Sequence, residues 1–203
     1  AEFYLGILIL WALLILAAFM ILGGRAAALF KAVREPTMLA FATASSEAAY
    51  PKTLAQLEKF GCSNRVASFV LPLGYSFNLD GSMMYCTFAV MFIAQAYGIE
   101  LSAAQQLTML LILMVTSKGM AGVPRASLVV IAATLAQFNI PEAGLLLLLG
   151  IDHFLDMGRS ATNVIGNLVA TAVVSKWEGQ LRSETEVAAE LANATSTEAA
   201  PKA

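Results

Sequence analysis

Polar side chains that would bind a charged small molecule lie in one otherwise apolar segment, GIDHFLDMGRSATNVIGN, residues 150–167. They recur every three or four residues, with an arginine beside them: Asp152, Asp156, Ser160, Asn163, Asn167 and Arg159. Because residues three or four apart share one face of a helix, this helix would be polar on one face. A guanidinium binds a carboxylate through two parallel hydrogen bonds, and a carboxylate binds an ammonium group. The segment predicts a site for a zwitterion, in which Arg159 and Asn163 hold carboxylates and Asp156 holds an ammonium group.

A purely structural role is the alternative for this polar face. Ser and Asn side chains often form hydrogen bonds between membrane helices. Two aspartates and an arginine at membrane depth are costly unless they are used, which favours a binding site. The single histidine, His153, is expected at a helix interface rather than in a proton relay.

The composition predicts a membrane protein. The chain has 203 residues, of which 59% are hydrophobic and 13% are charged. This charged fraction is about half that of a soluble domain. The net charge is −2 and the sequence has no basic patch, so no nucleic acid partner is expected. Cys62 and Cys86 lie in apolar surroundings without CxxC spacing, so we expect reduced thiols, no cofactor and no metalloenzyme site. No nucleophile–base pair is evident, so we expect no enzyme.

The apolar segments predict an all-α membrane protein with transmembrane helices and two re-entrant helical hairpins. Residues 3–23 carry no charge and are long enough to span a bilayer as one helix. Short apolar arms on either side of a polar tip favour re-entrant hairpins at residues 34–60 and 101–138. A helix over residues 140–177 would be roughly 57 Å long. We therefore expect it to be kinked, or to lie partly outside the bilayer.

The apolar segment at residues 64–97 is interrupted by GYSFNLDGS, whose Gly, Asn and Asp residues favour turns over helix. It predicts a discontinuous transmembrane helix with exposed carbonyl groups at its break. Asp80 and the carbonyl oxygens of Gly74 and Asn78 would hold a small cation, because hard cations prefer oxygen ligands. An ordinary turn is the alternative for this motif.

The two hairpins precede the broken helix and the polar helix at nearly the same interval, from Ser46 to Asp80 and from Ser117 to Asp152. Interrupted apolar segments at matching positions of two halves are typical of the inverted repeats that build transporter sites at mid-membrane. Ser45 and Ser46 at the first tip suit helix capping. A helix N-terminus also favours an anion, so capping and binding are compatible there.

Loop charges predict the orientation of the chain. Residues 24–65 contain a cluster of Lys and Arg, whereas the links near 98–106 and 138–143 carry only Glu. Because Lys and Arg stay on the cytoplasmic side, the first hairpin would enter from the cytoplasm and the second from outside. Lys176 and Arg182 would place the C-terminus inside. Residues 1–179 are interpreted as part of a transport domain from a longer protein, and the polar residues 180–203 as a mobile tail.

Four motifs in this order resemble the dicarboxylate/amino acid:cation symporter family, which includes glutamate and aspartate transporters: ASSEAAYP, NLDGS, SKGMAGVP and DMGRSATNVIGN. The resemblance covers residues 3–179. It implies transmembrane helix 6, hairpin 1, helix 7, hairpin 2 and helix 8 of that family. Five earlier helices, including the trimerisation scaffold, would then be missing from this sequence.

The resemblance also implies roles for matching residues. Ser45, Ser46 and Asn163 would contact the substrate's main-chain carboxylate, Asp156 its amino group and Arg159 its side-chain carboxylate. Residues Ser117 to Pro124 would form the gate. The full set of candidate substrate contacts is Ser45, Ser46, Ser82, Gly122, Val123, Asp156, Arg159, Ser160 and Asn163. The candidate cation ligands, if Na⁺ binds, are Gly74, Ser76, Asn78, Asp80, Ser117, Asn163 and Asn167.

Departures from the family pattern favour coupling to protons, or to fewer sodium ions. Asn167 stands where sodium-coupled members usually have an aspartate ligand. Lys118 adds positive charge beside Met120 near another sodium site, and Glu47 replaces a serine of the first tip. The ASSE, SKG and IGN patterns are shared with members that resemble C4-dicarboxylate carriers, although those usually lack the aspartate that stands here at Asp156.

The leading hypothesis is a symporter of the cell (inner) membrane that takes up glutamate or aspartate with H⁺ or Na⁺. It would move like an elevator and form a homotrimer when complete. The alternative is a symporter of C4-dicarboxylates such as succinate, malate or fumarate, against which the negative charge of Asp156 argues. A channel or structural subunit is the third hypothesis. Polarity confined to two tips, one helix break and one stripe favours an occluded site over a pore.

Overall fold

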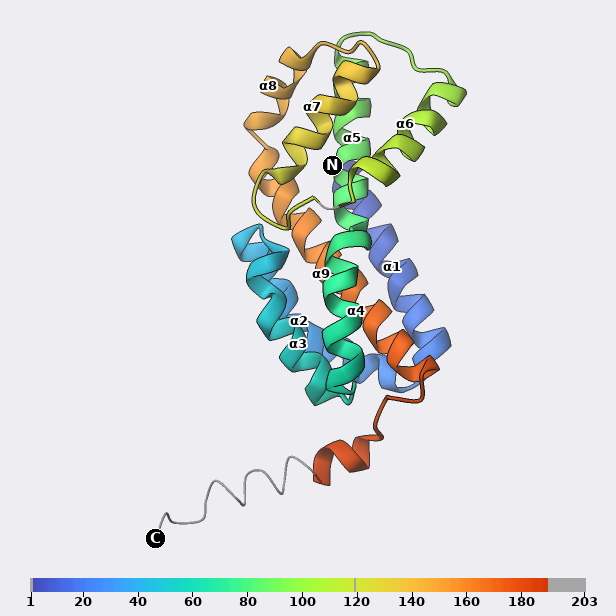
Figure 1. Cartoon of the computed structure of the whole chain (residues 1–203). Helices are drawn as coiled ribbons and strands as arrows, with labels where there is room; N and C mark the ends of the chain where they lie inside the picture. The colour runs from blue at the N-terminus through green and yellow to red at the C-terminus, as the bar shows by residue number, and fades with distance from the viewer. Residues whose placement is uncertain (1, 119, 190–203) are drawn as a thin grey trace.

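A computed structural model describes residues 2–118 and 120–189, which form an elongated bundle of helices (Figure 1). The helices are α1 (Glu2–Leu22), α2 (Arg25–Thr43), α3 (Ser46–Phe60), α4 (Asn64–Phe77), α5 (Asp80–Ala96), α6 (Ala103–Thr116), α7 (Ala126–Gln137), the 3-10 turn η1 (Glu142–Gly144), α8 (Leu145–Leu149) and α9 (Asp152–Trp177). Within the described residues, the one departure from helix and loop is an isolated β-bridge between Cys62 and Leu181. The predicted all-α class is confirmed.

Helix α1 lies along α9 and exposes an apolar face. Trp11 Nε1 donates a hydrogen bond to Thr162 Oγ1 at 2.9 Å, and Lys176 Nζ donates to the carbonyl of Ile21, so both helices are tied at two levels. The outer face of α1 carries large exposed apolar side chains: Leu5, Leu8, Ile9, Leu13, Leu16, Phe19 and Met20. Such a face suits contact with lipid chains. Among the described residues, α1 and the combined segment Asn64–Ala96 are long and apolar enough to cross a membrane.

Helices α2 and α3 form the first helix pair, which packs against α9. Ala44, in a left-handed conformation with φ 49°, ends α2. Ser45 then caps α3 by accepting a hydrogen bond from the Ala48 N–H at 3.2 Å. Helix α2 begins at Arg25, whereas the sequence predicted the arm from residue 34. The Ala-rich residues 25–33 have high helix propensity, which extends the arm.

The chain leaves helical geometry at Asn78 and Leu79, between α4 and α5, which run nearly in line (Figure 1). The turn-forming residues of the NLDGS motif therefore stand at the break. The carbonyl of Gly74 accepts a hydrogen bond from the Asn78 N–H at 2.7 Å. That carbonyl is not free, in contrast to the exposed group that the sequence suggested.

Helices α6 and α7 form the second helix pair, at the other end of the molecule from the first (Figure 1). Residues 117–125 connect them, with turns and loop at 117–118 and 120–125, and Arg125 ends this tip in a left-handed conformation with φ 64°. The predicted single segment at residues 140–177 is divided into η1, α8 and α9, with the interruption at Gly150 and Ile151. The helix with the polar face, α9, thus starts at Asp152, close to the second tip.

The apolar core has two parts that correspond to the two ends of the bundle. One cluster joins α2, α3 and α4 to the C-terminal half of α9, and includes Leu29, Leu57, Leu71 and Leu168. The other joins α5, α6, α7 and α8 to the start of α1. The boundary between the clusters lies where the two helix pairs meet, so polar groups there are held between two apolar bodies.

The residues after α9 contact the base of the first helix pair. Arg182 donates from its backbone N–H to Gly61 O at 2.9 Å and from Nη2 to Glu58 O at 3.0 Å. Residues 184–189 are helical. The rest of the predicted tail, residues 190–203, lies outside the described residues.

Candidate functional site

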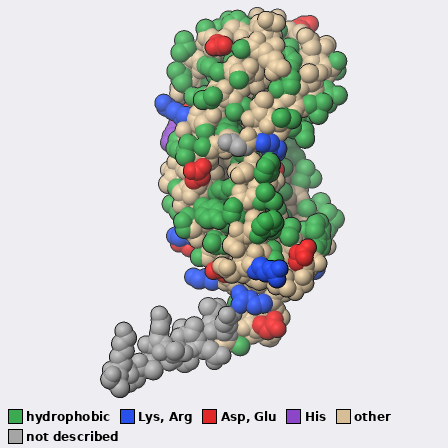
Figure 2. Space-filling view, viewed as in Figure 1, with side chains coloured by type: hydrophobic (Ala, Val, Ile, Leu, Met, Phe, Trp, Pro, Cys, Tyr) green, Lys and Arg blue, Asp and Glu red, His purple; other side chains and the backbone are tan. Residues whose placement is uncertain are grey.

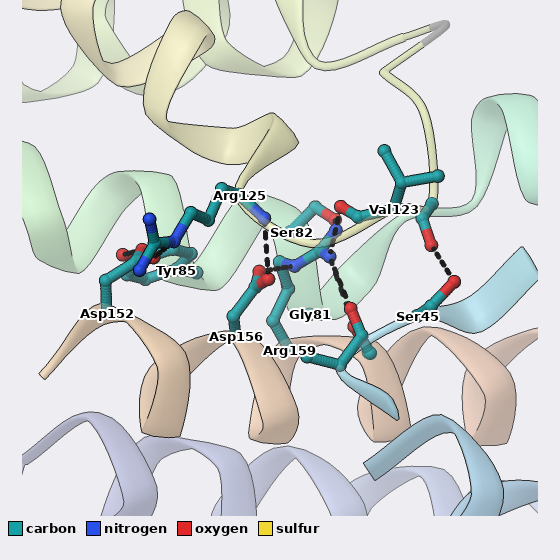
Figure 3. Close-up of polar contacts among 12 residues, drawn as sticks. Ser45, Gly81, Ser82, Tyr85, Val123, Arg125, Asp152, Asp156 and Arg159 are labelled. Atoms are coloured by element: carbon teal, nitrogen blue, oxygen red, sulfur yellow. Dashed lines mark hydrogen bonds and ion pairs between the residues drawn. The ribbon is translucent and has the colours of Figure 1, made fainter. Parts of the chain in front are cut away.

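Arg159 lies between the tips of the two helix pairs and contacts both. Its side chain is completely buried. Nη2 donates to Ala44 O of the first tip at 3.5 Å and to Val123 O of the second tip at 3.2 Å (Figure 3). Nη1 donates to Ser82 Oγ at 3.3 Å. The guanidinium can form all of these hydrogen bonds only when the two tips lie together.

Asp156 neutralises Arg159 one helical turn away. The two side chains form a buried ion pair through Arg159 Nε, and the other Asp156 oxygen accepts the Arg125 N–H at 2.8 Å. Both oxygens of the predicted ammonium ligand are therefore occupied. Arg159 Nη2 also donates to Ser160 Oγ at 3.1 Å, so Asp156, Arg159 and Ser160 of the polar face contact one another.

A second ion pair lies one turn before Asp156, at the start of α9. Asp152 is buried, accepts a hydrogen bond from the Tyr85 hydroxyl and lies 3.5 Å from Arg125 Nε (Figure 3). The residue spacing predicts Asp152 on the polar face, but it does not indicate Arg125 or Tyr85. The position of Arg125 directly after the GVP motif of the tip was the available signal for the first. Tyr85 lies in an apolar segment, and no sequence signal indicated its contact with Asp152.

Gly122 joins the second tip to the first. Its carbonyl accepts a hydrogen bond from Ser45 Oγ at 2.9 Å, and its N–H donates to Glu47 Oε1 at 2.8 Å. A side chain at this position would meet Ser46 Oγ at 2.4 Å, so the close approach requires glycine. Ser46 Oγ is buried and has no hydrogen-bond partner among the described residues. A buried polar atom without a partner is uncommon and suits a role in binding.

Asn163 caps α5 instead of presenting its amide. Its Oδ1 accepts the N–H groups of Gly81 at 2.9 Å and Ser82 at 3.2 Å, and its Nδ2 donates to Ser82 Oγ at 2.9 Å. Leu79, the residue at the N-cap of α5, provides no side-chain cap. Asn163 would have to exchange these hydrogen bonds to contact a carboxylate.

Several of the candidate cation ligands lie together at the break between α4 and α5. Asn167 Nδ2 donates to Asn78 O at 3.2 Å, and Asn78 Nδ2 donates to Asn167 Oδ1 at 3.4 Å. A side chain at Gly74 would meet Asn167 Oδ1 at 2.1 Å, so this backbone also approaches closely. The carboxylate of Asp80 packs against the backbone of Gly166, where a side chain would come within 2.2 Å of Oδ2.

Two candidate cation ligands are placed differently. Ser76 is exposed, and its hydroxyl donates to Pro72 O at 3.4 Å rather than to Asp80 or Asn167. It faces instead a cavity of about 530 Å³ beside the two tips. That cavity is lined by Glu47, Tyr50, Pro51, Pro72, Tyr75, Ser76, Met120 and Ala121. Ser117 ends α6 and is buried at the start of the second tip.

Charged residues buried between facing helix tips, beside a broken helix, are characteristic of membrane transport proteins. The fold and the site therefore define a protein of that class. A model of the sodium:dicarboxylate symporter family matches residues 1–177. The chain belongs to this family of membrane transporters, which agrees with the resemblance in the four motifs.

Relatives named as glutamate symporters and as C4-dicarboxylate transport proteins have similar sequence identity to this chain. The chain is 48% identical to the proton/sodium-glutamate symport protein of Bacillus caldotenax over 185 residues, 88% of this chain and 44% of the relative. It is 50% identical to the C4-dicarboxylate transport protein of Laribacter hongkongensis over 168 residues, 82% of this chain and 38% of the relative. It is 49% identical to the proton/glutamate-aspartate symporter of Escherichia coli over 150 residues, 74% of this chain and 34% of the relative. The chain thus spans less than half the length of these relatives.

Proposed function

We propose that this chain is the substrate-binding part of a symporter that takes up glutamate or aspartate together with H⁺ or Na⁺. The observation that carries the proposal is the buried Arg159–Asp156 pair at the junction of the two tips. On substrate binding, Arg159 would exchange the carbonyls of Val123 and Ala44 for the side-chain carboxylate. Asp156 would take the ammonium group, and Ser46, whose hydroxyl has no partner among the described residues, would donate to the main-chain carboxylate.

The helix pairs would act as re-entrant hairpins of an inverted repeat. They lie at opposite ends of the molecule with their tips at its middle (Figure 1), as two hairpins entering from opposite sides of a bilayer would. Lys and Arg side chains gather mainly at the end that carries the base of the first pair and the residues after α9 (Figure 2). This end, with the C-terminus, would face the cytoplasm of a cell whose inner membrane holds the protein.

Movement and assembly complete the proposal. The part formed by the helix pairs, α4, α5 and α9 would move as a unit through the membrane, like an elevator. The complete protein would form a homotrimer surrounded by lipid. The coupling ion would act at the cluster of Asn78, Asp80 and Asn167, and no cofactor or enzymatic step is required.

Uptake of C4-dicarboxylates is the second candidate function, and one observation favours it. Asp156 is engaged by Arg159 through one oxygen and by the Arg125 N–H through the other. Because its charge is neutralised in this way, Asp156 repels the second carboxylate of a dicarboxylate substrate less than an unpaired aspartate would. The 50% identity to a C4-dicarboxylate transport protein supports the same alternative.

Transport by the complete reading frame that encodes this chain separates the two candidates. In proteoliposomes, uptake of labelled L-aspartate and of labelled succinate is measured under an H⁺ gradient alone and a Na⁺ gradient alone. Asp156→Asn is expected to reduce aspartate uptake about 10- to 100-fold, because it removes a charged hydrogen bond worth ~1.5–3 kcal/mol, and to reduce any succinate uptake less, because succinate has no ammonium group. Succinate uptake without aspartate uptake in the unaltered protein would overturn the leading proposal in favour of the second.

A further inference from the structure

Lys118 places its ammonium group against the break between α4 and α5. Its Nζ donates a hydrogen bond to the carbonyl of Phe77, the last residue of α4. The last carbonyls of a helix lack intrahelical partners and carry the negative end of the helix dipole. A cation is stabilised at such a place, and here it comes from the tip of the second helix pair.

The same ammonium lies in the electrostatic field of a carboxylate. Asp80 begins α5 on the other side of the break, three residues after Phe77, and the positive charge of Lys118 is close enough to attract its carboxylate. Backbone carbonyls with one carboxylate are also the ligands that a hard inorganic cation prefers. A lysine ammonium is a compact charge with three donors on a flexible stem, so it can satisfy the same oxygen atoms.

We propose that Lys118 is a tethered cation: it holds the second tip against the α4–α5 break and takes the place that a bound inorganic cation would fill when the site closes. The proposal rests on the proposed function, in which the tips close over a substrate. It extends that function to the coupling ion. Closure of the second tip would require one inorganic cation fewer, because the positive charge belongs to the tip itself.

The affinity for substrate in two salts tests this proposal. The protein is the complete reading frame, purified, with binding of L-aspartate titrated in choline chloride and in sodium chloride of equal ionic strength. Lys118→Met removes the charge and keeps much of the chain length, Lys118→Arg keeps a cation, and Lys31→Met removes an exposed lysine of α2 as the matched control.

The measured quantity is the ratio of the dissociation constant in choline to that in sodium. In Lys118→Met this ratio is expected to rise at least tenfold above that of the unaltered protein, because sodium can then fill the place that the ammonium has left. Lys118→Arg and Lys31→Met should keep the original ratio. A Lys118→Met ratio equal to the original one, including equal weakening in both salts, overturns the proposal.

A substrate-free readout separates this proposal from the proposed function. Ser46 is buried beneath Gly122 of the second tip, so the thiol of Ser46→Cys reacts with a maleimide when that tip lifts. The native Cys62 and Cys86 are buried. Adding Lys118→Met should speed labelling several-fold in choline, and sodium should slow it again. If aspartate does not bind, the proposed function fails, but the labelling experiment still tests the role of Lys118. That role is overturned if Lys118→Met leaves the labelling rate unchanged, or if sodium does not slow the labelling of this variant.

Discussion

The two helix pairs meet at one point but are held in different ways. In the first pair, α2 and α3 pack along each other and both contact α9, with Ala44 and Ser45 as the only residues between them. In the second pair, α6 buries just Met109 and Leu113, and residues 117–125 join it to α7. We infer a fixed wall on one side of the site and a movable tip on the other.

The contacts that close the second tip are polar and come from several elements. Gly122 binds the first tip, Val123 O accepts from Arg159, Lys118 donates to α4, and Arg125 contacts α9. A hydrogen bond of this kind contributes only ~0.5–1.5 kcal/mol net. Opening the second tip would therefore cost a few such contacts, whereas displacing the first pair would expose an apolar core. Asymmetry of this kind suits a gate.

The largest effect is expected from replacing Arg159, the residue of α9 that contacts the tips of both pairs. Arg159→Gln leaves Asp156 buried without its partner, which costs ~3–5 kcal/mol, and removes the hydrogen bonds to both tips. Uptake of either candidate substrate should fall at least ~100-fold, since 1.4 kcal/mol is tenfold. Denaturant unfolding in detergent and proteoliposome uptake measure the two effects.

The double variant Asp156→Asn, Arg159→Gln is the control for this change. It leaves no unpaired charge in the site, so unfolding stability should recover by more than half while uptake stays lost. Recovery of uptake would show that the charge of Arg159 is not needed to read the substrate, and would remove the main support for the proposed site.

The next largest effect is expected on the unfolding free energy when an apolar side chain is shortened in the first pair rather than in the second. Leu57 of α3 is fully buried, and Leu107 of α6 is 59% exposed. Leu57→Ala should destabilise the protein by ~2–5 kcal/mol, because it leaves a cavity in the core around α2 and α9. Leu107→Ala should change the unfolding free energy by less than ~0.5 kcal/mol. Equal losses in the two variants would mean that the second pair is as firmly packed as the first.

Much of the site could be predicted from the sequence because it lies on one regular helix. The four-residue spacing of Asp152, Asp156 and Ser160 places them on one face whatever surrounds the helix. The break at NLDGS followed from turn-forming residues in an apolar run. Both signals are local, and both depend on residue types that are rare in membrane helices.

What could not be predicted depends on contacts between distant segments. No spacing indicates that Gly122 meets Glu47, or that Asn163 would be used to cap α5. The early start of α2 was not predicted, although its Ala-rich sequence favours helix. Side-chain partners across the two tips are set by packing of the whole bundle, which a single sequence does not display.

The smallest effect is expected at the contact between the tips themselves. Glu47→Ala removes the acceptor of the Gly122 N–H, a contact between a backbone group and an exposed carboxylate. The loss should be about 1 kcal/mol, and thus a roughly fivefold weaker apparent affinity for substrate. Binding titration at fixed salt and pH measures it.

Glu47→Gln separates the hydrogen bond from the charge. A Gln side chain keeps an acceptor oxygen of the same reach, so its affinity should lie near that of the unaltered protein, with Glu47→Ala clearly weaker. If the Gln variant is instead as weak as the Ala variant, the negative charge matters rather than the acceptor. The first tip would then take part in coupling, and the division into a fixed wall and a movable gate would have to be given up.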